Sequence, residues 1–386
     1  MALRFVARTF LIPSLCLAAV AAPGTPLLAQ RDAAQSPQVE STAVDKSAID
    51  GMTRRAVEFL RLRGQKPDGS FSDSVGVTAV VAAGLTNSGV SADDPVVAKA
   101  FDYLLKHVQA DGGIYAAGSR HANYETCIAA MAINEVNDGG KYDELLDRAE
   151  QFIRKGQWDQ EEGADEQDLR YGGAGYGSKA RPDMSNTAFM VEALKELGAT
   201  EDDPAIQKAL IFVTRCQNLE SELNSSPYAA KVDDGGFYYT VAAGGSSVAG
   251  ETEGGGLRSY PAMTYAGLKS MIYAGLDDSD FRVKAAKDFL RKNYSVEQNP
   301  FLGDQGLFYY YQTMSKALSA NGEPVFEAED GPHVWRRELL NQLKDRQRED
   351  GSWVNSNERF MESDPNLVTG YNLLTLATIA GEQHGN

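Results

Sequence analysis

The chain has 386 residues, of which 42% are hydrophobic and 24% are charged, and both values are typical of globular proteins. Its formal net charge of −17 disfavours nucleic acids and anionic membrane surfaces as partners. The length fits one large domain or two ordinary ones.

The first 29 residues have the pattern of a secretory signal peptide. Arg4 and Arg8 precede a short apolar run, LIPSLCLAAVAA, and small residues follow up to a cleavage point near Ala29. The run is too short to span a bilayer comfortably, and an uncleaved anchor is the alternative. We therefore expect an exported protein, periplasmic or secreted, without a stable membrane span.

Residues 30–48 are small and polar, which indicates a disordered leader. No stretch within residues 49–380 resembles a linker, so we predict a single domain there, followed by a tail at 381–386. Two cysteines remain after cleavage of the signal, Cys127 and Cys216, each within a helical pattern. We expect both to be buried thiols, because a chain of this size has enough core without disulfides, and one bridge is the alternative.

A two-helix unit recurs along the domain, about every 43–45 residues where no loop is inserted. In VVAKAFDYLLKHVQADGGIY the apolar residues form one stripe of an amphipathic helix, and a Gln, a glycine turn and an aromatic residue follow. The next segment, NYETCIAAMAINEV, is small and apolar on most sides, as expected for an inner helix. Six such copies predict an all-α array, and the spacing leaves open whether it closes into a ring.

The recurring Gln has a plausible structural role at the end of each outer helix. It stands at the following positions, with Asn293 replacing it in the fifth copy: Gln65, Gln109, Gln157, Gln217 and Gln347. Its amide is placed to bond the exposed backbone of the glycine turn and so to pin the helix end to its neighbour. We interpret the motif as structural, with catalysis at one copy as the alternative.

The stretches QADGGIY and QREDGSW resemble the Gln-to-Trp repeats of squalene-hopene cyclases. Over about residues 53–380 the chain resembles the prenyltransferase and squalene-cyclase repeat family. The resemblance implies an α/α toroid, with six inner and six outer helices around a central cavity. It also implies a partner that is an isoprenoid or another apolar small molecule, as for class II terpenoid cyclases and the β subunits of protein prenyltransferases.

The catalytic groups of that family are incomplete in this sequence. Class II cyclases protonate an alkene with the middle acid of an Asp-X-Asp-Asp run. In the matching stretch DMSNTA, Asp183 keeps the first place, but Ser185 and Asn186 replace the proton donor and its neighbour. Prenyltransferases hold zinc with an Asp, a Cys and a His, and Glu125 stands where that His is expected. We therefore predict no metal and no cofactor.

The inner helices begin beside the turns, so their first residues should surround one mouth of the cavity. Glu125 and Asp183 are the catalytic candidates, because a carboxylate at the start of an apolar helix can have a raised pKa and act as an acid. For Glu125 the alternative is a helix N-terminal carboxylate satisfied by backbone N–H groups. The substrate-binding candidates are His121, Tyr124, Asn186, Arg258, Tyr260, Thr264 and Gln312.

Three further segments have two interpretations each. The aromatic runs at 237–239 and 307–311 fit either a cavity for a polyisoprenoid or ordinary core packing. The glycine-rich loop 242–260 is a candidate lid over the cavity. The acid-rich loop 158–168 is best explained as a solvated loop, with calcium binding as the alternative.

Three functions are compatible with these features. The first is a lipid enzyme of the cyclase and prenyltransferase type that uses other acids. The second is a non-catalytic exported toroid that binds a ligand or a protein. The third is a glycan-active enzyme with the same (α/α)6 shape, in which Glu125 and Asp183 form the acid pair that glycosidases need.

Overall fold

The computed structural model describes residues 42–381. The expected signal peptide, most of the leader and all of the tail beyond residue 381 lie outside the described residues. Helix α1 begins at Lys46, with Asp45 as its N-cap, so the last residues of the expected leader are already helical. Within the described range, none of the helices has the length and apolar character of a membrane span.

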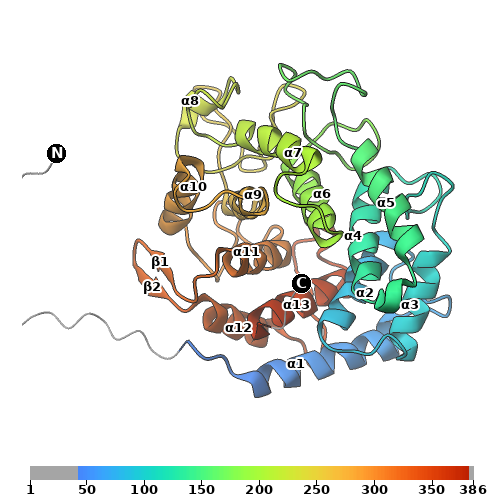
Figure 1. The fold of residues 1–386 in the computed structure, drawn as a ribbon. Coiled ribbons are helices and arrows are strands. Elements are labelled where there is room, and N and C mark those ends of the chain that lie inside the picture. The colour runs from blue at the N-terminus through green and yellow to red at the C-terminus, as the bar shows by residue number, and fades with distance from the viewer. Residues whose placement is uncertain (1–41, 382–386) are drawn as a thin grey trace, which may run out of the picture. The chain divides into compact units, whose positions relative to one another are not determined.

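Six inner helices form a closed ring in the part of the chain that the structure describes (Figure 1). They are α2 (Val75–Asn87), α4 (Ala122–Asn134), α6 (Met184–Glu196), α9 (Pro261–Tyr273), α11 (Leu307–Asn321) and α13 (Pro365–Ala380). Each packs on the next, and α13 returns to pack on α2. The inner helices are buried on most sides, as α2 shows with every residue from Val75 to Thr86 buried.

The outer helices are α1 (Lys46–Phe59), α3 (Pro95–Leu105), α5 (Asp143–Lys155), α7 (Pro204–Arg215), α10 (Phe281–Lys292) and α12 (Trp335–Arg346). They cover this ring from outside: α3, α5, α7 and α10 pack against α2, α4, α6 and α9, and both α1 and α12 pack against α13. They are amphipathic: in α5 only Leu146, Ala149 and Ile153 are buried. The prediction of an all-α toroid of six helix pairs is confirmed.

A few short elements complete the fold. A π-helical turn, η1 (Leu60–Gly64), extends α1, and the short helix α8 (Ala229–Val232) lies in the loop between α7 and α9. The single-turn helices η2 (Asp138–Gly140) and η3 (Arg359–Met361) lie in loops. Strands β1 (Phe326–Ala328) and β2 (Gly331–His333) form an antiparallel hairpin before α12, with Phe326 opposite His333.

In four of the six copies the recurring Gln side chain pins neighbouring repeats together, as predicted. The Gln217 amide nitrogen donates to the carbonyl of Gly235 in its own turn and to that of Arg282 at the start of α10, at 2.9 Å each. Gln65 and Gln157 make the equivalent pair of bonds. Gln347 bonds Gly351 at 2.9 Å and Met52 of α1 at 3.0 Å, so the last repeat is fastened to the first.

Two copies depart from this arrangement. The amide of Gln109 donates within its own repeat, to the carbonyls of His107 and Tyr115. Asn293 is one methylene shorter than Gln, and its amide donates to the Phe289 carbonyl of the same helix. In these copies the side chain does not reach the next outer helix.

A threonine in the inner helix completes the turn in five copies. Its hydroxyl accepts the N–H of the residue that ends the turn, as Thr264 does from Phe237 at 3.0 Å. The other four are Thr78, Thr126, Thr187 and Thr369. The two cysteines, Cys127 and Cys216, are buried and free, in agreement with the prediction of buried thiols.

Candidate functional site

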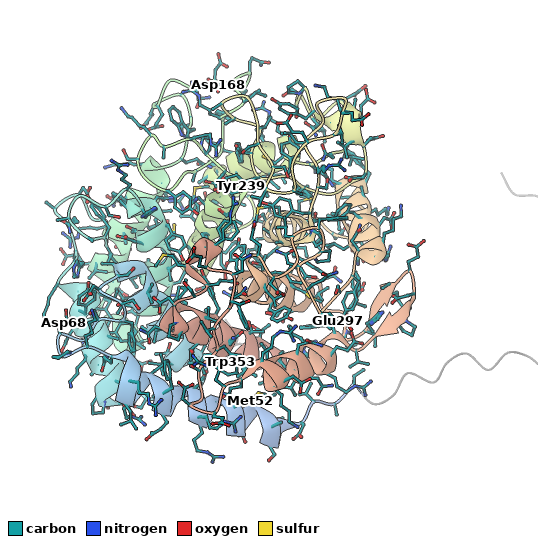
Figure 2. The ribbon with its side chains drawn as sticks, turned by 180° about the vertical axis from the view of Figure 1, so that it is seen from behind. Met52, Asp68, Asp168, Tyr239, Glu297 and Trp353 are labelled. Atoms are coloured by element: carbon teal, nitrogen blue, oxygen red, sulfur yellow. The ribbon has the colours of Figure 1, made fainter. Side chains whose placement is uncertain are left out.

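A cavity of about 580 Å³ opens at the end of the ring where the inner helices begin. Its wall is mostly aromatic and aliphatic. The aromatic side chains that line it are Tyr124, Tyr176, Phe189, Tyr239, Tyr260, Tyr309, Phe360 and Tyr371. Figure 2 shows Tyr239 toward the middle of the molecule, whereas Asp68 and Asp168 lie at its periphery.

The aromatic rings contact one another around the cavity. Tyr124 packs edge-on against Phe189 with ring centroids 5.3 Å apart, and Tyr309 packs against Tyr371 at 6.3 Å. The hydroxyls of Tyr124 and Tyr371 lie 3.4 Å apart. Burial raises the pKa of Tyr124 to about 12, so this phenol is neutral at physiological pH. The wall therefore offers π faces and uncharged hydroxyls to a ligand.

Glu125 lines the cavity from the first turn of α4. Its side chain is buried, and its two oxygens accept the N–H of Ala116 and the hydroxyl of Ser119, at 2.9 Å each. The carboxylate is thus satisfied by the turn that precedes α4. Among the described residues it is the single carboxylate in the cavity lining.

Asp183 is the N-cap of α6 and lies behind the cavity wall. One oxygen accepts the N–H of Asn186 at 3.0 Å and the Ser185 hydroxyl at 2.6 Å, and the other accepts the Asn186 amide at 2.8 Å. Burial raises its pKa despite these bonds. Of these three residues Ser185 lines the cavity, whereas Asp183 and Asn186 do not.

The other binding candidates divide into two groups. His121, Tyr124 and Tyr260 line the cavity. Asn186, Arg258, Thr264 and Gln312 are absent from the lining. Arg258 donates to the Glu251 carbonyl within the glycine-rich loop, and Thr264 has the turn-bonding role described above.

The two aromatic runs are split between core and cavity. Phe237, Tyr310 and Tyr311 are fully buried in the core, whereas Tyr239 and Tyr309 line the cavity. The glycine-rich loop contributes Ser246, Ser247 and Val248 to the wall. Bonds such as that from the Ser247 hydroxyl to the Arg258 carbonyl, at 2.6 Å, hold it there.

Sequence patterns missed two arginines at the mouth, Arg181 and Arg359. Both come from irregular segments: Arg181 precedes α6, and Arg359 begins η3. Their side chains lie beside aromatic rings, with guanidinium carbons 5.8 Å from the Tyr239 centroid and 5.3 Å from the Phe360 centroid. No helical or strand periodicity covers either residue, and so no local pattern could single them out.

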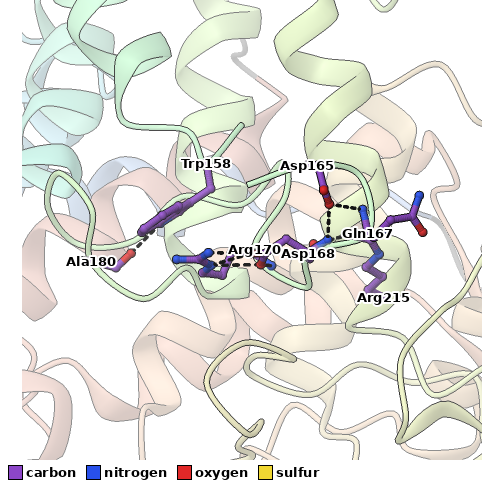
Figure 3. A network of polar contacts seen from close by, with 7 residues as sticks. All are labelled: Trp158, Asp165, Gln167, Asp168, Arg170, Ala180 and Arg215. Atoms are coloured by element: carbon purple, nitrogen blue, oxygen red, sulfur yellow. Dashed lines mark hydrogen bonds and ion pairs between the residues drawn. The ribbon is translucent and has the colours of Figure 1, made fainter. Parts of the chain in front are cut away.

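The acid-rich loop is held by its own cations rather than arranged around a metal (Figure 3). Asp168 pairs with Arg170, which lowers the pKa of the carboxyl, and the Arg170 guanidinium lies 4.3 Å from the Trp158 ring centroid. Asp165 accepts backbone N–H groups of Gln167 and Asp168. Across residues 42–381, no three acidic, His or Cys side chains are grouped so as to hold a metal ion.

A buried ion cluster lies farther along the same inner helices. Glu192 of α6 pairs with Lys269 of α9 and with Lys316 of α11, and Glu192 and Lys269 are almost fully buried. Burial alone would raise the pKa of Glu192, but the two lysines lower it to about 2. The cluster links α6, α9 and α11, and its residues come later in these helices than the cavity-lining residues Phe189, Met263 and Tyr309.

Residues 72–241 match the family model of the squalene-hopene cyclase C-terminal domain. The match covers somewhat less than half of the chain, and it confirms the resemblance to the squalene-cyclase and prenyltransferase repeat family. No curated protein sequence matches the chain. Fold and repeats together thus define an α/α toroid of the terpenoid cyclase and prenyltransferase type.

Solved structures share this fold at low sequence identity. A glycosyl hydrolase of family 88 from Bacteroides vulgatus is 10% identical, with 89% of this chain and 100% of that chain covered and a TM-score of 0.55. The Candida albicans protein geranylgeranyltransferase-I, complexed with GGPP, is 13% identical over 86% and 90%, with a TM-score of 0.51. A protein from Actinoplanes is 15% identical over 86% and 99%, with a TM-score of 0.50. At these identities the likeness establishes the fold alone.

Proposed function

We propose that the toroid binds an isoprenoid or another elongated apolar molecule in its central cavity. The aromatic lining supports this most directly: a cavity of about 580 Å³ has a wall made mainly of Tyr, Phe, Met, Leu and Val side chains. That volume lies within the range of small-molecule pockets, and such sites are mostly apolar with a few placed polar groups. Transfer of apolar ligand surface from water onto this wall is favourable by roughly 25 cal/mol per Å².

Catalysis, if it accompanies binding, must use groups other than those of the family. The Asp-X-Asp-Asp acid is replaced by Ser185 and Asn186, and the remaining acid, Asp183, is occupied in capping α6. Glu125 is the acidic group in direct contact with the cavity. We therefore propose ligand binding as the function. If the bound ligand is also converted, Glu125→Gln and Asp183→Asn are the first variants in which to measure loss of that turnover.

The glycan-active alternative is less well supported by the lining. Glycosidases place two carboxylates on either side of the scissile bond. Among the described residues that line the cavity there is one, Glu125, and Asp183 lies behind the wall. The family 88 hydrolase shares the fold, but a shared fold does not imply a shared reaction.

Native mass spectrometry of the full chain incubated with farnesol, a neutral isoprenoid alcohol, tests the proposal. We expect a one-to-one adduct that the variant Val248→Trp weakens, because Val248 lies in the cavity wall and an indole there would fill part of the space. The matched control is Leu62→Trp, since Leu62 is 69% exposed in η1. No adduct, or an adduct equally strong in both variants, would contradict binding in the cavity. An adduct with oligosaccharides in its place would favour a glycan-active protein.

We also propose that the protein is exported, on the strength of the charged, apolar and small-residue order of its first 29 residues. Mass spectrometry of the protein isolated from its native source should give a mature N-terminus close to Gln30. An N-terminus at Met1 would contradict cleavage.

A further inference from the structure

The fifth repeat is joined to the next outer helix by a histidine cluster instead of a Gln. Asn293, the C-cap of α10, donates its amide to the Phe289 carbonyl of its own helix and does not reach α12. The next residue, Tyr294, does reach it, because its hydroxyl donates to a Glu338 oxygen in the first turn of α12 at 2.9 Å. The side chains around Glu338 therefore decide how firmly this junction is held.

His333, the last residue of β2, lies at the centre of the junction. Its Nδ1 faces both oxygens of Glu338, at 3.1 and 3.0 Å, and its Nε2 faces an Asp330 oxygen at 2.9 Å. The imidazole packs on the Tyr294 ring with centroids 4.3 Å apart, and Tyr294 stacks on Phe326 of β1 at 5.4 Å. One imidazole thus contacts a carboxylate of the hairpin and a carboxylate of α12 at the same time.

Contacts on both sides hold the hairpin in place around His333. The Glu329 N–H donates to the Arg291 carbonyl of α10 at 2.9 Å. The indole N–H of Trp335, at the start of α12, donates to the Glu323 carbonyl at 3.0 Å, and the Trp335 side chain is fully buried. These anchors position the imidazole between its two carboxylates, so its protonation state decides how strongly it binds them.

The arrangement suits a charged imidazole. A neutral imidazole has one N–H and one lone pair, so one of its nitrogens would face a carboxylate without a proton between them. An imidazolium donates from both nitrogens, and such charge-assisted bonds are the stronger kind. The bond from His333 lowers the pKa of Asp330, which is therefore a carboxylate near neutral pH. The two carboxylates lie on different ring nitrogens, so their oxygens do not converge on a point where a metal ion could be held.

The groups around the ring favour the charged form. Within residues 42–381, the titratable groups that face the ring are Asp330 from the hairpin turn, Glu338 from α12 and Tyr294 from the segment after α10. Burial lowers the pKa of His333, but the bonds and charges of Asp330 and Glu338 outweigh burial and raise the pKa above 6.5. Burial and the Glu338 charge raise the pKa of Tyr294, so its hydroxyl stays a donor.

We infer that His333 is a pH-sensitive clasp, whose imidazolium fastens α12 to the end of the fifth repeat through Glu338 and Asp330, and that loss of its proton loosens the hairpin and the first turn of α12. The side chain is 21% exposed, so its proton exchanges with solvent. The folded protein binds this proton more tightly than the unfolded chain does. The clasp is therefore closed below pH 6.5 and is lost as the pH rises through the raised pKa. None of these residues lines the cavity, so the clasp does not depend on the proposed function.

Hydrogen–deuterium exchange of the full chain, measured by mass spectrometry at about pH 6 and about pH 8.5, tests the clasp. After correction for the intrinsic exchange rate, we expect residues 326–338 of the parent to exchange roughly fivefold to tenfold faster at the higher pH, because partly exposed charge-assisted bonds are lost. His333→Phe keeps a ring on Tyr294 but removes both bonds, and it should show no such acceleration. His107→Gln, which removes a histidine bonded to the Tyr103 carbonyl, is the control and should respond to pH as the parent does.

A nuclear magnetic resonance titration of the histidine rings gives a second, independent readout. His333 should titrate above pH 6.5, and Glu338→Gln should move its titration toward 6.5. This variant also decides the matter if His333→Phe does not fold. A titration of His333 at or below 6.5, or one that Glu338→Gln leaves unchanged, would overturn the clasp. So would equal acceleration of exchange at residues 326–338 in the parent and in His333→Phe.

Discussion

Replacing Gln217 by Leu tests whether the recurring Gln fastens the repeats. Gln217 is fully buried, and its amide nitrogen donates to the carbonyls of Gly235 and Arg282 at 2.9 Å each. Leu has a similar volume, so the change creates little cavity. It removes two hydrogen bonds, each worth about 1 kcal/mol net, and leaves two carbonyls with one partner fewer. The amide oxygen has no partner, so its removal costs nothing.

We expect Gln217→Leu to lower the free energy of unfolding by about 2–4 kcal/mol. Urea denaturation followed by circular dichroism measures this as a lower midpoint at an unchanged slope. Gln160→Leu, at an exposed position, is the control and should stay within about 0.5 kcal/mol of the parent. Equal midpoints for the two variants would refute the fastening role and leave the motif without a structural explanation.

Three further predictions concern other buried polar groups. Burial raises the pKa of the Glu362 carboxyl from 4.5 to about 7, so the folded state binds the carboxyl proton more tightly than the unfolded state does. The free energy of unfolding should therefore fall by on the order of 3 kcal/mol as the pH rises from 4.5 to 7. Glu362→Gln should flatten this pH dependence, as measured by urea denaturation. Glu192→Leu should cost about 3–5 kcal/mol, measured by the same method, because Lys269 and Lys316 lose their buried partner. Thr264→Val should cost about 1–2 kcal/mol and leave the farnesol adduct unchanged in native mass spectra.

Each of these has a clear contrary result. If the free energy of unfolding depends on pH in the same way for the parent and for Glu362→Gln, a group other than Glu362 causes that dependence. Glu253→Gln, an exposed change in the glycine-rich loop, is the control for Glu192→Leu, and equal stability of the two variants would mean that the ion cluster contributes nothing. Loss of the farnesol adduct in folded Thr264→Val would show that Thr264 contributes to ligand binding after all.

The sequence by itself determined the helices, the six repeats and the all-α architecture. Amphipathic and fully apolar segments alternate along the chain, and hydrophobic periodicity is a local property that any short window carries. The Gln role was predictable for the same reason, because helix end, Gln and glycine turn are adjacent in sequence. His121, Tyr124, Glu125 and Tyr260 were placed at the cavity by one geometric rule, that inner helices begin at its mouth.

Tertiary structure alone decided that the ring closes and that two arginines line the same cavity at one end of it. Gln347 reaches Met52 only because the last repeat returns to the first. Arg181 and Arg359 are far apart in sequence and lie in irregular segments, and they meet the same cavity because α6 and the loop before α13 reach the same end of a closed ring. Such contacts depend on how all six helix pairs pack around one axis, and no local pattern of residue types records that arrangement.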